Sequence, residues 1–276
     1  MNFDTSVLFG GIYMLTLKVV VPQNAGFSQG TMGFLSSAIA EGRVTLESFL
    51  RFVQGGKDKN PPSATIVEDA YKILGENNVL AQYQAAEAWR IPMGEKVPVR
   101  YSRSTLERCA KENAGKQACW WLVFIQALSL LRQCGVLSSR REGALFSPRR
   151  GWLEQAEGNI GLNATDVFSP GYYLLDLAGR FGRVPWSDQE EEIKRLGHSF
   201  ARANEAVVSE AALSIRMVFG RSPLGSFRHW GVTTNERGER IAVGQTEPSG
   251  MEVQFYNPTT KMYQFLRCVL VILPES

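Results

Sequence analysis

The amino-acid sequence predicts an α+β fold with a mainly helical body, an N-terminal strand and a small C-terminal antiparallel β element. Its 276 residues, 44% of them apolar and 21% charged, have the composition of an ordinary globular chain with a sizeable core. Apolar residues recur at helical spacing through much of the first 220 residues, and alternating patterns concentrate near the two ends. We therefore expect the helical body at residues 1–220 and a β-hairpin subdomain at residues 221–276.

The first ninety residues predict one strand followed by four short helices. Leu15, Leu17 and Val19 alternate with polar residues, which is typical of a strand over residues 12–21. Periodic apolar residues then predict the helices, and glycines, which favour the residue after a helix, indicate where three of them end. We expect these helices to end at about Gly42, Gly55, Gly75 and Trp89.

The middle of the chain predicts a short strand and two helices. Residues 97–101 alternate like a strand, although Pro98 weakens the pattern. Ser104 and Glu107 have the spacing of a capping box, so we expect a helix to begin there. The apolar run Ala118–Leu131 is shorter than the roughly 18–20 residues of a membrane span. We interpret this run as a buried helix.

The last ninety residues predict one long helix and two hairpins. A capping box at Ser187 opens a helix whose apolar spine continues to Ile215 and which stops at Gly220. Alternating segments on either side of polar turns then predict the hairpins. The hairpins pair residues 229–234 with 239–243 and residues 251–256 with 262–273. The N-terminal strand could add to their sheet.

Motifs for common catalytic chemistry are absent from the sequence. Four cysteines and two histidines do not provide a disulfide scaffold, a zinc ribbon or a histidine-rich metal site. Neither a glycine-rich phosphate loop nor a serine elbow occurs, and we predict no cofactor, no metal and no catalytic residue. Cys109, which lies beside basic residues, and His229 are the remaining candidates for chemistry. An enzyme whose site is assembled from scattered acids and His229 stays an alternative.

Charge is distributed unevenly along the chain. Residues 96–150 contain eleven basic and three acidic residues, a net charge of 11 − 3 = +8. The whole chain has a net charge of +3, so the remainder carries 3 − 8 = −5. A basic block within a slightly acidic protein is typical of a surface that binds polyanions. We call residues 96–150 the basic segment.

The basic segment is the predicted nucleic-acid-binding site. Arginine binds phosphate with two parallel hydrogen bonds, and aromatic side chains stack on unpaired bases. Because arginines lie close to Phe146 and Trp152 at a loop of about residues 138–151, single-stranded RNA is favoured over duplex DNA. The predicted contact residues are Arg100, Arg103, Arg108, Lys111, Arg140, Arg141, Arg149, Arg150 and Trp152. An alternative is a DNA-binding regulator of the ribbon-helix-helix kind, since a strand and two helices are expected in that order.

The remaining expectations concern partners and location. An acidic residue, Asp4, leads the chain and Lys18 interrupts its first apolar stretch, so we predict no secretory signal and no transmembrane segment. We expect an intracellular, non-catalytic and self-associating protein, which is either cytoplasmic or part of a virion or ribonucleoprotein assembly. Its expected partners are nucleic acid and other copies of the chain or subunits of a complex, as in a nucleoprotein or coat.

Overall fold

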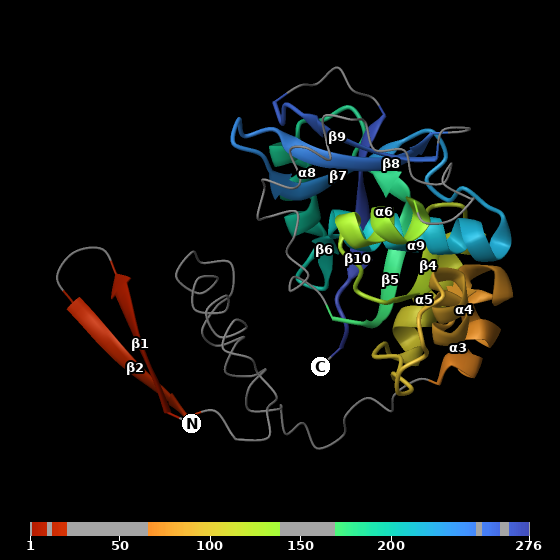
Figure 1. Ribbon diagram of the computed structural model, residues 1–276, viewed down its shortest axis with the longest axis horizontal. Helices are drawn as coiled ribbons and strands as arrows, with labels where there is room; N and C mark the ends of the chain where they lie inside the picture. Colours follow the sequence, from red (N-terminus) through yellow and green to blue (C-terminus); the bar gives the residue numbers. More distant parts are fainter. Residues whose placement is uncertain are drawn as a thin grey trace. The chain divides into compact units, whose positions relative to one another are not determined.

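A computed structural model describes residues 2–9, 13–20, 66–138, 169–246, 250–259 and 265–275 of the chain (Figure 1). The chain groups into two compact units, residues 1–61 and residues 62–275. In the first unit, β1 (Asn2–Phe9) and β2 (Tyr13–Val20) pair antiparallel in a two-stranded sheet. The strand predicted at 12–21 is therefore confirmed as β2, and its partner is β1. The helices predicted to end at Gly42 and Gly55 lie outside the described residues.

The second unit is built on an eight-stranded mixed sheet. Its strands are β3 (Val79–Leu80), β4 (Trp120–Ile125), β5 (Gly171–Arg180), β6 (Phe200–Arg202), β7 (Arg228–Thr234), β8 (Arg240–Thr246), β9 (Gly250–Tyr256) and β10 (Leu266–Ile272). They are ordered β3-β4-β5-β10-β7-β8-β9. Strand β6 pairs with residues 270–272 of β10, which also pair with β5, whereas β7 pairs with residues 266–267. The β3–β4 and β10–β7 pairs are parallel, and the other pairs are antiparallel.

Short helices surround this sheet. They are α3 (Val67–Leu74), the single-turn η1 (Glu76–Asn78), α4 (Gln82–Trp89), α5 (Arg103–Ala114), α6 (Leu130–Ser138), α8 (Trp186–Leu196) and α9 (Glu205–Phe219). The helices predicted to end at Gly75 and Trp89 are confirmed as α3 and α4. Helix α9 packs against β4, β7 and β8 and also contacts α4 and α6 (Figure 1). In the described residues no helix combines the length and the apolar character needed to cross a membrane.

The predicted fold class is wrong, because the second unit is an α/β fold organised by its sheet and not a mainly helical body. The central strand shows why. Strand β10 pairs with β5, β6 and β7, which come from widely separated parts of the chain. Periodicity within a short window reports local hydrogen bonding and carries no information about such distant pairing.

The apolar run Ala118–Leu131, interpreted above as a helix, contains strand β4. All six residues of β4 are buried, between β3 and β5. A strand that is covered on both faces does not alternate, and its sequence resembles that of a buried helix. Helix α6 begins only at Leu130, after a loop whose Ser129 side chain accepts a hydrogen bond from the N–H of Arg132.

The long helix predicted from Ser187 to Gly220 is also wrong, because it is interrupted by a strand. Helix α8 ends at Gly197, whose φ of 103° lies outside the range of a right-handed helix. The chain then forms β6, which pairs with β10. The side chain of Asn204 accepts the N–H of Ala206 and starts α9, and Gly220 ends α9 as predicted.

One of the two predicted hairpins is confirmed. Strands β7 and β8 pair antiparallel across a turn in which the side chain of Asn235 accepts the N–H groups of Arg237 and Glu239. The second hairpin is wrong, since β9 pairs with β8 whereas β10 enters the centre of the sheet. A hairpin of β9 with β10 would also satisfy backbone hydrogen bonds. The observed pairing depends on β5 and β7, which lie on either side of β10 in the sheet.

Candidate nucleic-acid interface

Helix α5 carries three of the predicted contact residues. It begins at Arg103, and the N-cap is Ser102, whose hydroxyl accepts the N–H of Thr105 at 3.3 Å. The predicted capping residue, Ser104, therefore lies two residues after the actual N-cap. Leu106 and Cys109 are the buried residues of the helix and attach it to the core. The opposite side, which includes Arg108 and Lys111 at a spacing of three, faces solvent.

The described part of the basic segment, residues 96–138, has a net charge of 7 − 2 = +5. All seven cations have exposed side chains: Lys96, Arg100, Arg103, Arg108, Lys111, Lys116 and Arg132. Among the described residues, only Arg103 of these seven is held in an ion pair, with Glu107 at 2.7 Å. The other acid, Glu112, accepts the indole N–H of Trp120 at 2.7 Å and lies 3.5 Å from Arg180. Six of the seven cations are therefore in no ion pair with a described residue.

An aromatic side chain lies directly beneath one of these cations. The guanidinium carbon of Arg108 is 5.5 Å from the ring centroid of Phe200, which belongs to β6. Phe200 in turn contacts Trp120, with ring centroids 6.3 Å apart. Sequence reasoning missed Phe200 because it is far from the basic segment in the chain, and no local pattern connects the two.

Arg100 lies just before α5, and it is not part of a strand. In the segment 97–101 only an isolated bridge at Val99 is present. The predicted strand is therefore wrong, and the strand–helix–helix order of the ribbon-helix-helix alternative is not found here. The carbonyl of Arg100 accepts the N–H of Glu275 at 2.9 Å, so the C-terminal residues run beside the start of α5.

Glu275 brings an acid to this basic surface. Its Oε1 accepts hydrogen bonds from the hydroxyls of Ser102 and Thr105, at 2.8 and 2.6 Å. Partial burial acts to raise the pKa of Glu275, but these hydrogen bonds and the nearby charge of Arg108 hold it below its usual value. Sequence reasoning did not find this contact either, since it joins two ends of the second unit.

The remaining predicted contact residues lie outside the described residues. They are Arg140, Arg141, Arg149, Arg150 and Trp152. Their assignment to a phosphate-binding loop stays a prediction. Of the nine residues predicted for the interface, the structure places four: Arg100, Arg103, Arg108 and Lys111.

Neither candidate for catalytic chemistry is accessible. His229 is fully buried, and its Nδ1 accepts the N–H of Val269 at 3.0 Å. The ring proton therefore resides on Nε2, which donates to the carbonyl of Ala203 at 2.8 Å. Cys109 is also buried, and burial raises the pKa of its thiol to about 12. Both ring nitrogens of the histidine are committed to the backbone, and the thiol stays protonated at neutral pH.

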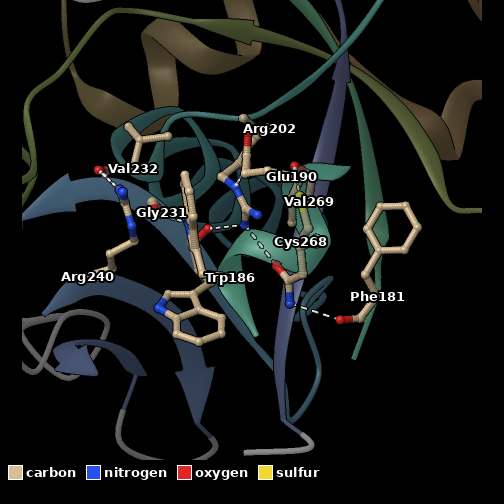
Figure 2. Close-up of polar contacts among 12 residues, drawn as sticks. Phe181, Trp186, Glu190, Arg202, Gly231, Val232, Arg240, Cys268 and Val269 are labelled. Atoms are coloured by element: carbon tan, nitrogen blue, oxygen red, sulfur yellow. Dashed lines mark hydrogen bonds and ion pairs between the residues drawn. The ribbon is translucent and has the colours of Figure 1, made fainter. Parts of the chain in front are cut away.

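A second group of charged side chains is structural. Trp186, the first residue of α8, lies between Arg202 and Arg240 (Figure 2), whose guanidinium carbons are 4.8 and 3.5 Å from its ring centroid. Arg202 Nε contacts Glu190 at 2.5 Å. Its Nη1 donates to Gln189 Oε1 at 3.0 Å and to the carbonyl of Trp230 at 2.7 Å. These bonds join α8, β6 and β7.

Neither a metal site nor a similar known protein points to the function of this chain. Within the described ranges, no group of three or more histidine, cysteine, aspartate or glutamate side chains could hold a metal ion. No family model, no curated protein and no solved structure matches the chain. The case for a function therefore rests on the chain's own residues.

Proposed function

We propose that this chain binds nucleic acid without catalysis, that the basic segment contacts the phosphates, and that single-stranded RNA is the preferred ligand. One observation carries the proposal: all seven described cations of the segment are exposed, and only one of them is in an ion pair with a described residue. Phosphate contacts supply most of the affinity in such complexes, and they require cations that can approach the backbone of the nucleic acid.

The arrangement on α5 supports phosphate contact in particular. Arg108 and Lys111 extend from the same side of a helix that the core holds in place through Leu106 and Cys109. Cations on a rigid element lose little entropy when they bind, compared with cations on a mobile chain. The guanidinium group of Arg108 also lies over the ring of Phe200, and this cation–π contact favours an extended side chain.

The preference for single strands rests on the aromatic side chains predicted beside the arginines at 138–152. Unpaired bases stack on such rings, at about 1–3 kcal/mol per base. Among the described helices, α5 packs against α3, whose one cation, Lys72, is paired with Asp69. This neighbour does not provide a second basic helix of the kind that reads a groove. We infer that the ligand is bound by its backbone and its exposed bases.

An equilibrium binding measurement tests the proposal. A fluorescein-labelled 20-nucleotide oligouridine is titrated with the protein, and anisotropy is recorded from 50 to 300 mM salt. The triple variant Arg100→Gln, Arg108→Gln, Lys111→Gln is expected to bind at least about tenfold more weakly at low salt. The slope of log K against log salt should fall by about 2, because each phosphate contact to a single strand contributes about 0.7.

A charge-matched control is available elsewhere on the surface. Lys194→Gln, Arg195→Gln and Arg237→Gln together remove three exposed cations from α8 and from the turn between β7 and β8. This control should retain the affinity of the natural chain. Equal losses in the two triple variants would show that only net charge matters, and unchanged binding in the first would remove α5 from the interface. Tighter binding of a duplex of the same length would contradict the preference for single strands.

We also propose that the protein self-associates or forms part of a larger assembly, inside a cell or in a virion or ribonucleoprotein. A protein that coats RNA through phosphates gains affinity when neighbouring copies bind together. Light scattering of the protein, with and without the oligouridine, should give a mass above that of one 30.7 kDa chain. A mass of one chain under both conditions would contradict self-association while leaving the RNA-binding test unaffected.

A further inference from the structure

The chain that leaves β10 crosses to the start of α5, and we call its residues 273–275 the strap. The N–H of Leu273 donates to the carbonyl of Ser199 at 2.9 Å, which keeps the first residue of the strap beside β6. The N–H of Glu275 donates to the carbonyl of Arg100 at 2.9 Å. The strap therefore brings Glu275, an acidic residue from outside the basic segment, to the surface on which α5 begins.

The contacts of the Glu275 side chain fit an ionised carboxylate. Its Oε1 accepts hydrogen bonds from the hydroxyls of Ser102 and Thr105, at 2.8 and 2.6 Å. Partial burial acts to raise the pKa of Glu275, but these donors and the charge of Arg108 lower it. At neutral pH the strap thus carries a negative charge next to the cations of the proposed interface.

The cations beside this carboxylate belong to the predicted contact residues. Arg100 precedes α5, and Arg108 lies six residues after the N-cap, Ser102. The side chains of both arginines are exposed, and neither is in an ion pair with a described residue. A phosphate that approaches these arginines is repelled by the nearby carboxylate of Glu275.

Among the described residues, hydrogen bonds hold the strap more than apolar packing does. Leu273 is 45% exposed, and Pro274 is exposed and has no N–H that could donate. The chain is anchored just before the strap, where Ile272 is buried and its carbonyl accepts the hydroxyl of Tyr101 at 3.0 Å. Release of the strap therefore exposes little apolar surface and leaves β10 in place.

We propose that the strap is an autoinhibitory element, in which Glu275 occupies the start of α5 until a polyanion displaces it. The inference rests on the proposed phosphate-binding role of the basic segment. In the closed state the hydroxyls of Ser102 and Thr105 donate to Glu275. In the open state they can donate to a phosphate oxygen beside Arg108, since serine and threonine hydroxyls commonly contact phosphates. Because the open state is the one that binds fully, the closed strap lowers the apparent affinity.

The variant Glu275→Gln tests the effect of the charge on affinity. Glutamine keeps an oxygen that accepts both hydroxyls, but it carries no charge. We expect the labelled oligouridine to bind this variant about three- to tenfold more tightly at 50 mM salt. Removal of a unit charge roughly 6 Å from a phosphate has this effect at effective dielectric constants of about 40–80.

A matched control changes the net charge of the chain by the same amount. Glu236 is exposed in the turn between β7 and β8, and Glu236→Gln should alter the affinity by less than about twofold. Equal gains in Glu236→Gln and Glu275→Gln would overturn the proposal, because net charge alone would then explain them.

Amide hydrogen exchange in the natural chain measures displacement of the strap and requires no variant. Saturation with oligouridine should raise the exchange rate at the N–H of Glu275 at least about fivefold, since release breaks its bond to Arg100. The N–H of Val269 within β10, which donates to His229, is the control and should not change. A Glu275 N–H that stays equally protected in the complex would make the strap a structural tie and refute displacement.

Inorganic tripolyphosphate separates this inference from RNA binding. It should also accelerate exchange at Glu275 and bind Glu275→Gln about three- to tenfold more tightly. If oligouridine binds neither protein, the proposed function fails and the tripolyphosphate result decides the role of the strap. If oligouridine binds both proteins equally and the strap stays closed, RNA binding stands and autoinhibition is refuted. The absence of an effect with either polyanion also refutes it.

Discussion

Replacement of Arg202 with methionine is expected to lower the free energy of unfolding by about 3–5 kcal/mol. The Arg202 side chain is 2% exposed and makes the bonds to Glu190, Gln189 and the Trp230 carbonyl that join α8 to β7 (Figure 2). Methionine fills a similar volume but donates no hydrogen bond. The buried amide oxygen of Gln189 and the carbonyl of Trp230 then lose a partner, which costs about 1–3 kcal/mol each.

The control for this prediction is Arg195→Met on α8. Arg195 is paired with Glu192, but its side chain is 72% exposed, and such pairs contribute at most about 1 kcal/mol. Urea unfolding at pH 7, followed by tryptophan fluorescence, compares both variants with the natural chain. If the free energy of unfolding of Arg202→Met lies within about 1 kcal/mol of the natural chain's, the prediction is contradicted. The network of Figure 2 then does not stabilise the fold.

Acidification is expected to destabilise the protein through His229. Burial, with a smaller contribution from the charge of Arg202, lowers the pKa of His229 to about 3 from an ordinary value of 6.5. Protonation would also place a hydrogen on Nδ1, which faces the Val269 N–H. Above pH 6.5 the histidine is neutral in both the folded and the unfolded chain. Below pH 6.5 only the unfolded chain takes up the proton, so stability falls by up to about 1.4 kcal/mol per pH unit until about pH 3.

The variant His229→Gln isolates this effect from other titrating groups. We expect the natural chain to be the more stable at pH 7 and its advantage over the variant to shrink as the pH falls from 6.5 to 4.5. The measurement is the difference between the two free energies of unfolding at each pH, which cancels contributions shared by both proteins. A difference between the natural chain and His229→Gln that stays constant from pH 6.5 to 4.5 would contradict the prediction.

His229 and Glu210 act in opposite directions on stability. The raised pKa of Glu210 contributes stability at low pH that is lost between about pH 4.5 and 8. The lowered pKa of His229 contributes stability at high pH that is lost below 6.5. Burial disfavours the charged form of His229 and also that of Glu210, a buried residue of α9. From these two groups we expect maximal stability at mildly acidic pH.

The exposure of the four described contact residues could be predicted, because charge and exposure are largely local properties. Arg100, Arg103, Arg108 and Lys111 are exposed as the sequence analysis expected, since a charged side chain is rarely buried without a partner. Arg202 is the counterexample. It lies in a segment that looked like ordinary helix, and its burial depends on partners from α8 and β7. No signal within the segment could have indicated this.

The proximity of Phe200 and Glu275 to α5 could not be predicted either, because it depends on residues that are distant in the sequence. Phe200 reaches Arg108 only because β6 pairs with the end of β10. Glu275 reaches Ser102 because the chain continues beyond β10 toward α5. Each contact follows from the position of one strand in the sheet, which the residues around α5 do not specify.

By itself, the sequence determined the uneven charge of the chain, the ends of α3, α4 and α9, and the β7–β8 hairpin. Each depends on a few neighbouring residues: cations in one segment, a glycine or a proline after each helix, and a polar turn between alternating strands. Only the tertiary structure decided that residues 120–125 form a strand and that β10 pairs with β5, β6 and β7. A buried apolar run satisfies its backbone equally well in a helix or in a sheet. For residues 120–125, pairing with β3 and β5 favours the strand over the helix.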